Sequence, residues 1–179
     1  GGSATVDGGT GCAAALGWRL LDEDRRDVVP CGESLISIRT VVPPDDLADF
    51  PSAEVLCDVT NPLCGPNGAA AVYGPQKGAT PDMVRALDAG LAQLAETIRK
   101  ATGRDVADVP GAGAAGGFGA GAMAFLGGTL VRGIDAVSKA CKLEKALRDA
   151  DAVVTGEGRF DAQSLQGKVV DGVVAAARR

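Results

Sequence analysis

Charged side chains gather directly after one apolar segment near the end of the chain. Ala152–Val154 predicts a buried strand, and the glycine-containing loop behind it carries Glu157, Arg159, Asp161 and Lys168. In open α/β sheets, ligands bind beyond the carboxyl ends of strands. Phosphoryl transfer needs a carboxylate for Mg²⁺ or for the proton of the nucleophile, and cations that offset phosphate charge. The loop therefore fits a phosphoryl-transfer centre, and the competing interpretation is a surface turn with an Arg–Glu pair.

A second strand end repeats this pattern. The predicted strand Glu54–Asp58 ends in an acid, and Thr60 and Asn61 follow in a loop rich in turn-forming residues. Lys77 lies in the sequence GPQKG (74–78), which predicts a rigid turn from which an ammonium could bind an anion. For a single lysine the alternative is an ordinary solvated side chain.

Glycine-rich loops are the third feature that points to phosphate. The loop 110–121 includes Gly111, Gly113, Gly116 and Gly117 and leads into an apolar helix through Phe125. Glycine tolerates positive φ and lets backbone N–H groups approach a ligand, and a helix N-terminus attracts anions. The loop also matches G-x-G-x-x-G, but the residues before it form a poor strand, which weakens the dinucleotide interpretation. Tight helix packing remains the other explanation.

The chain contains no histidine. This excludes Ser-His-Asp and Cys-His nucleophilic sites and disfavours a transition-metal centre. Proton transfer then depends on Asp, Glu, Lys or Tyr, and any metal is expected to be a hard cation held by oxygen, such as Mg²⁺. We therefore expect Asp161 to act at the phosphoryl-transfer centre, with Asp58 as a second candidate ligand for the metal.

Composition limits the partners and the compartment. The chain has 179 residues with a net charge of −5, which argues against a nucleic-acid surface. No apolar run is long enough for a transmembrane helix, and the sequence has no signal-like start, so we expect no membrane partner. The five cysteines form no Cys-x-x-Cys pair and are odd in number, which predicts reduced thiols and a cytoplasmic protein. Oligomeric state does not follow from the sequence.

Predicted strands alternate with predicted helices along the chain and must position these residues. This alternation predicts an α/β fold with a mixed or largely parallel sheet and flanking helices. A helix opening at Thr80-Pro81-Asp82 and closing at Gly103 has the strongest signals, with an apolar stripe that includes Met83, Leu91 and Ile98. The other predicted helices are Thr10–Leu16, one or two within Ile134–Leu147, and a last one from Val169. The other predicted strands are Trp18–Leu21 and Ser34–Val42.

Five segments together resemble the glycerate kinase family, in its bacterial type with two α/β domains. They are GGSATVDGG (1–9), CDVTNPL (57–63), YGPQKGA (73–79), PGAGAAGG (110–117) and TGEGRFD (155–161), the last followed by QS (163–164) and GK (167–168), and they occur in the order of the family. The resemblance covers nearly all of the chain. It implies phosphorylation of D-glycerate by ATP with Mg²⁺, at the 2-hydroxyl in members of this type.

The resemblance also implies roles for individual residues. Catalysis would use Asp161, Glu157, Arg159 and Lys168. Asp58, Thr60 and Asn61 would bind glycerate or its metal. Eight further residues of the matching segments would contact substrate or phosphate, namely Ser3, Thr5, Asp7, Lys77, Gly111, Gly113, Gly116 and Gly117.

The chain differs from the family in its extent. The family's N-terminal Asp-Ser-Phe-Lys-Gly stretch is missing, so we expect residues 1–179 to be a single domain or a fragment, resembling the inserted domain of a two-domain kinase. On its own this piece should have little activity. Two other hypotheses remain, an NAD(P)-binding oxidoreductase domain, in which Asp135 would follow the glycine loop, and a non-catalytic anion-binding module.

Overall fold

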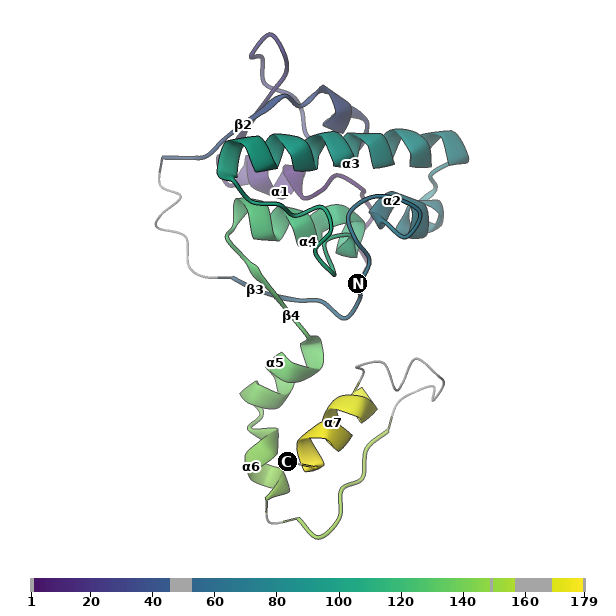
Figure 1. Cartoon of the computed structure of the whole chain (residues 1–179), viewed down its shortest axis with the longest axis vertical. Helices are drawn as coiled ribbons and strands as arrows, with labels where there is room; N and C mark the ends of the chain where they lie inside the picture. Colours follow the sequence, from purple (N-terminus) through teal and green to yellow (C-terminus); the bar gives the residue numbers. More distant parts are fainter. Residues whose placement is uncertain (1, 46–52, 149, 157–168, 179) are drawn as a thin grey trace. The chain divides into compact units, whose positions relative to one another are not determined.

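The computed structural model describes residues 2–45, 53–148, 150–156 and 169–178. Contacts divide the chain into two compact units (Figure 1). Unit 1 consists of Gly1–Val55 and Val59–Leu130, and unit 2 of Leu56–Asp58 and Val131–Arg179. The predicted α/β class is confirmed in outline, because helices predominate and the described strands form two small sheets of two strands each.

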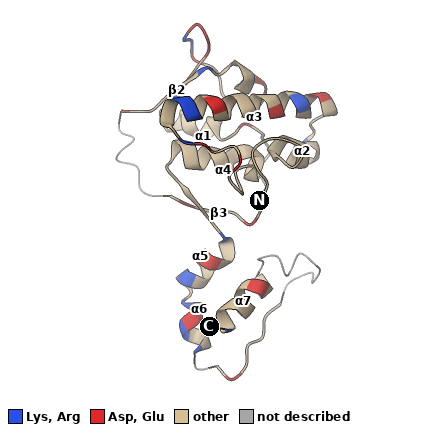
Figure 2. Ribbon diagram, viewed as in Figure 1, with Lys and Arg blue, Asp and Glu red and all other residues tan. Residues whose placement is uncertain are grey.

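Helix α3 (Pro81–Thr102) is the longest element of unit 1 and confirms the strongest sequence prediction. Thr80 accepts the backbone N–H of Met83 through its hydroxyl at 3.3 Å, and Gly103 ends the helix with a φ of +73°. In the apolar stripe of α3, Leu91 and Ile98 are buried. The prediction that Met83 belongs to this buried stripe is wrong, because Met83 lies in the first turn and is 51% exposed. Acidic and basic side chains both occur along α3 (Figure 2).

Strands β1 (Arg19–Leu21) and β2 (Thr40–Val42) form an antiparallel pair in which Leu20 faces Val41. The predicted strand Ser34–Val42 is wrong over its first half, because Glu33–Ser37 is the 3₁₀ helix η1. Leu35 and Ile38 are both fully buried, whereas Ile36 is 47% exposed. The apolar period here is thus three, as in a 3₁₀ helix, and not the two of a strand. Helix η1 packs on α3.

The rest of unit 1 consists of short helices. Helix α1 (Thr10–Ala15) follows the N-terminal loop, and α2 (Ala69–Tyr73) leads into the 3₁₀ helix η3 (Pro75–Lys77). Helix α4 (Ala114–Phe125) includes the later part of the glycine-rich loop 110–121 and contacts α1, α2 and α3 (Figure 1). A shared apolar core includes Trp18, Leu35, Leu91 and Phe125. This core fixes the loops that carry the site residues.

Strands β3 (Glu54–Leu56) and β4 (Thr129–Val131) form the second pair. Cys57 donates its N–H to the carbonyl of Val131, and Thr129 donates to that of Ala53, which is the parallel arrangement. The extended sheet that we expected is not seen in the described part of the chain. The predicted strand Ala152–Val154 is wrong as well. These residues have no strand structure, and Val154 is 98% exposed.

Unit 2 contains the helices α5 (Gly133–Ala140), α6 (Leu143–Leu147) and α7 (Val169–Ala177), each contacting the other two. The prediction of one or two helices within 134–147 is confirmed, since the structure has two, and the left-handed Lys142 (φ +55°) separates them. Among the helices that the structure describes, none combines the length and the apolar character that a bilayer span requires.

Candidate functional site

Asp7 organises the N-terminal loop that precedes α1. Its Oδ1 accepts the backbone N–H of Gly9 at 3.1 Å and its Oδ2 accepts that of Gly11 at 3.3 Å. The hydroxyl of Thr5 lies 3.4 Å from the same carboxylate. Asp7 thus stabilises this turn by accepting backbone N–H groups, as Asp commonly does before a helix. Its charge also acts on a lysine from a distant part of the chain.

That lysine is Lys77, at the end of η3. Its Nζ donates to the Oγ of Ser3 at 2.9 Å and to the backbone carbonyl of Thr5 at 2.6 Å. Burial lowers the pKa of the Lys77 ammonium below its ordinary value, although the nearby carboxylate of Asp7 raises it. Three residues predicted from the sequence, Ser3, Thr5 and Lys77, therefore form one polar cluster within unit 1.

The glycine-rich loop 110–121 lies against this polar cluster. Ala115, Gly116 and Gly117 adopt left-handed φ angles of +52°, +74° and +90°, so the regular part of α4 begins only after them. Gly116 accepts the N–H of Gly8 through its carbonyl at 3.0 Å. A Cβ on Gly116 would lie 2.1 Å from the carbonyl oxygen of Thr5 and 2.9 Å from Lys77 Nζ. Only glycine permits this backbone contact, because the conformation and the lack of space both exclude a side chain.

Two further glycines shape the same loop. Gly111 has a φ of +91°, and a Cβ on Gly113 would lie 2.2 Å from the carbonyl oxygen of Pro62. Gly113 also donates its N–H to the carbonyl of Asn61 at 3.0 Å. The loop that contains Asn61 and the glycine loop are therefore joined through their backbones.

The side chain of Asn61 serves this junction as well. Its Oδ1 accepts the hydroxyl of Tyr73 at 2.6 Å, and its Nδ2 donates to the carbonyl of Asn67 at 2.8 Å. Thr60 beside it is exposed. Sequence reasoning assigned no role to Tyr73. A sequence signal for a role of Tyr73 exists, because it is the one tyrosine of the chain and the first residue of the YGPQKGA segment.

Asp58 belongs to unit 2 and caps a helix there. Its Oδ1 accepts the N–H of Gly133 at 2.8 Å, at the start of α5. The part of the chain that the structure describes has no group of three or more His, Cys, Asp or Glu side chains suited to a metal. Mg²⁺ bound together with substrate phosphates needs only one or two carboxylates from the protein. Asp58 fits as one such donor through its other oxygen.

Glu157, Arg159, Asp161 and Lys168 lie outside the described residues. Their assignment thus rests on the sequence alone.

A dinucleotide site does not fit the geometry of the G-x-G-x-x-G segment. Residues 104–110 contain no strand, and 107–110 form bends and a turn, although the dinucleotide fingerprint follows a strand directly. Asp135, which would have to meet the ribose, lies in the first turn of α5 with Arg132 at 3.5 Å. The glycines instead hold the N-terminal loop and Lys77 in place.

The five segments named above lie within one continuous family match. A sequence model described as the glycerate kinase family matches residues 1–179. The chain belongs to the glycerate kinase family. The strandless G-x-G-x-x-G loop is thus a glycerate kinase loop that matches the dinucleotide pattern in letters only.

Members of the glycerate kinase family match this chain from end to end. It is 47% identical to the glycerate 2-kinase of Escherichia coli (strain K12), with 100% of this chain and 48% of the relative covered. Identity to the glycerate kinase of Bacillus subtilis (strain 168) is 46%, with 99% and 47% covered. A crystal structure assigned as glycerate kinase 2 from Salmonella typhimurium LT2 matches with a TM-score of 0.88 and 48% identity, covering 100% of this chain and 48% of the other. The chain therefore spans about half the length of these glycerate kinases.

Proposed function

We propose that this chain supplies part of the active site of a kinase that transfers the γ-phosphoryl group of ATP to the 2-hydroxyl of D-glycerate, with Mg²⁺. Family membership supports the reaction class, and the name of the Escherichia coli relative, glycerate 2-kinase, supports the choice of hydroxyl. The observation that carries the proposal is the cluster in which Lys77 contacts Ser3 and Thr5 beside Gly116.

This cluster suits an anionic group. An ammonium has three N–H donors, and Lys77 gives two of them to Ser3 and Thr5. The third N–H serves an oxygen of a phosphate or of the glycerate carboxylate. Because Lys77 is partly buried, its charge is less screened than that of a surface lysine, and a charge-assisted hydrogen bond to an anion is correspondingly stronger.

The proposed reaction forms a bond between the glycerate hydroxyl oxygen and the γ-phosphorus, and breaks the bond to the β–γ bridging oxygen, so that ADP leaves. The hydroxyl proton passes to a carboxylate, for which we propose Asp161 with Glu157 nearby. Arg159 and Lys168 offset charge on the phosphoryl group. Mg²⁺, held in part by Asp58, would neutralise phosphate charge, and Thr60 and Asn61 would line the glycerate side.

Lys77→Met tests the cluster, because methionine keeps the apolar stem and removes the charge. We expect kcat/KM for D-glycerate and MgATP to fall about 10–100-fold, since a charged hydrogen bond contributes about 1.5–3 kcal/mol. Lys100→Met, at an exposed lysine beside Glu96, is the matched control. Coupled ADP assays should use protein of the length of its relatives, because the 179 residues alone are expected to turn over little. Equal losses in both variants would contradict the proposal.

Asp161→Asn tests the catalytic carboxylate separately. A positioned acid or base contributes about 10²–10⁴ to the rate, so kcat should fall by at least two decades while the melting temperature stays unchanged. An exposed turn carboxylate would change neither stability nor rate. A kcat within a factor of about three of wild type, which is less than 1 kcal/mol of barrier, would refute the role of Asp161.

A further inference from the structure

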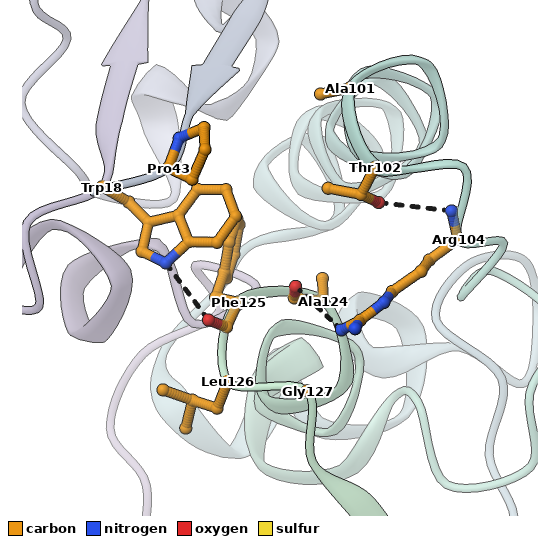
Figure 3. A pocket seen from close by; sticks show the side chains of 9 residues that line it. All are labelled: Trp18, Pro43, Ala101, Thr102, Arg104, Ala124, Phe125, Leu126 and Gly127. Carbon is orange, nitrogen blue, oxygen red and sulfur yellow. Dashed lines mark hydrogen bonds between the residues drawn. The ribbon is translucent and has the colours of Figure 1, made fainter. Parts of the chain in front are cut away.

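A cavity of about 340 Å³ lies in unit 1 at the end of α4 (Figure 3). Its walls come from four segments distant in sequence, and its lining includes Trp18, Pro43, Thr102, Arg104 and Leu126. Pockets that take small ligands commonly have about 300–1,000 Å³ and apolar walls with a few fixed polar groups. This cavity has that size, its lining combines apolar side chains with exposed polar atoms, and it contains none of the residues assigned to phosphoryl transfer.

The aromatic wall is rigid. Trp18 and Phe125 pack edge to face with ring centroids 5.1 Å apart, and they are only 4% and 2% exposed. The indole Nε1 of Trp18 donates to the carbonyl of Phe125 at 3.1 Å (Figure 3). A wall fixed by packing and by a hydrogen bond loses little conformational freedom when a ligand binds.

Arg104 is the one charged side chain among the residues that line this cavity. Its Nη1 donates to the carbonyls of Met123 at 2.6 Å and Ala124 at 3.3 Å, and Figure 3 shows the guanidinium lying at the edge of the cavity. No carboxylate within the described ranges forms an ion pair with Arg104, unlike Arg19, Arg85 and Arg99.

The two carbonyl contacts hold the arginine in place but do not use its whole donor set. A guanidinium carries five N–H donors in a planar fork, and only those on Nη1 are donated here. The remaining edge suits the two oxygens of a carboxylate, and the apolar side chains of the lining suit a hydrocarbon body. We propose that this cavity is a binding site for a small carboxylic acid with an apolar body, which pairs with Arg104 and packs against Pro43 and Leu126 beside the buried Trp18.

Trp18 provides a direct readout, because it is the one tryptophan in the sequence. In a titration with benzoate, the indole N–H resonance of Trp18 should shift in a saturable manner, with a dissociation constant in the millimolar range or below. Benzamide has the same shape without the charge and should bind at least about tenfold more weakly, as expected for the loss of a charged hydrogen bond. Inorganic phosphate and D-glycerate lack the apolar body and should also bind more weakly.

Arg104→Gln should weaken benzoate binding about tenfold or more, while Arg99→Gln, at an arginine paired with Glu96 on α3, should leave it unchanged. If Arg104→Gln disturbs the end of α4, Ala101→Phe supplies a second test, because it fills the cavity and keeps the guanidinium. This variant should abolish benzoate binding without lowering the melting temperature. The proposal is overturned if benzoate does not bind, if benzamide or phosphate binds equally well, or if Ala101→Phe binds benzoate as wild type does.

Discussion

Replacing Gly116 by alanine tests the contact on which the proposed anion site depends. The added Cβ would lie 2.1 Å from the carbonyl oxygen of Thr5, a distance at which the backbone must move. It would also lie 2.9 Å from Lys77 Nζ, but that atom ends a flexible side chain and moves at little cost. Moving the Thr5 carbonyl also disturbs the 2.6 Å hydrogen bond that it accepts from Lys77.

The expected magnitude has two parts. Holding alanine at a left-handed φ costs about 1–2 kcal/mol, and forcing an extra methyl group into a packed site costs about 1–3 kcal/mol. Gly116→Ala should therefore lower the free energy of unfolding by about 2–5 kcal/mol. Gly103→Ala is a matched control, because Gly103 has nearly the same φ, +73° against +74°, and no atom within 4 Å of its added Cβ. The control should show the backbone cost alone.

Urea unfolding measures both variants, and the difference between their free energies of unfolding isolates the steric contact. We expect Gly116→Ala to be about 1–3 kcal/mol more destabilising than Gly103→Ala. Anion binding at Lys77 should weaken only in the Gly116 variant. A difference of less than about 0.5 kcal/mol, the usual error of such comparisons, would mean that the Thr5 carbonyl does not lie over Gly116.

Three further outcomes follow from the geometry and the pKa shifts. Since burial lowers the pKa of Lys77 below 10.5, activity should decline on the alkaline side at a pH below that value. Asp7→Asn removes the charge that raises this pKa and should therefore move the decline to lower pH. A decline that begins only at or above pH 10.5 would refute this. Asp58→Ala should speed amide exchange at the start of α5 by about fivefold, for a cap of about 1 kcal/mol, whereas Asp58→Asn, which keeps an acceptor, should not. In the native protein a thiol reagent should label the exposed Cys31 well before Cys64. Hydrogen bonding with Ser34 lowers the pKa of the Cys31 thiol, whereas burial raises that of Cys64 to about 12. Equal labelling rates would contradict this, and denaturation should expose all five thiols.

The sequence predicts elements well where several local signals agree. The ends of α3 follow from Thr80, Pro81 and Gly103, and each of these residues acts in the structure as its type requires. The strand prediction for 34–42 was wrong over its first half because Leu35, Ile36 and Ile38 fit both the period of a strand and that of a 3₁₀ helix. Only packing against α3 decides which of these side chains are buried. Local pattern alone cannot make that choice.

The candidate site shows the same division. The glycine-rich loops could be recognised from composition. The contact of Gly116 with Thr5 could not be predicted, because the two residues are far apart in sequence. Asn61 and Asp58 were predicted as ligand-binding side chains. The structure shows that Asn61 hydrogen-bonds Tyr73 and that Asp58 caps α5. Polar residues in loops also stabilise those loops through local hydrogen bonds, and the sequence does not distinguish this use from ligand binding.

The parallel pairing of β3 with β4 has a consequence for synthesis of the chain. The loops and helices from Cys57 to Gly128 all lie between the two strands in the sequence, so β3 leaves the ribosome long before its partner exists. At roughly 5–20 residues per second, β3 stays unpaired for several seconds. Its backbone N–H and C=O groups are open during that time, and Leu56 is 57% exposed even in the folded protein. Slow translation between these strands would prolong the period in which β3 can pair with the wrong chain.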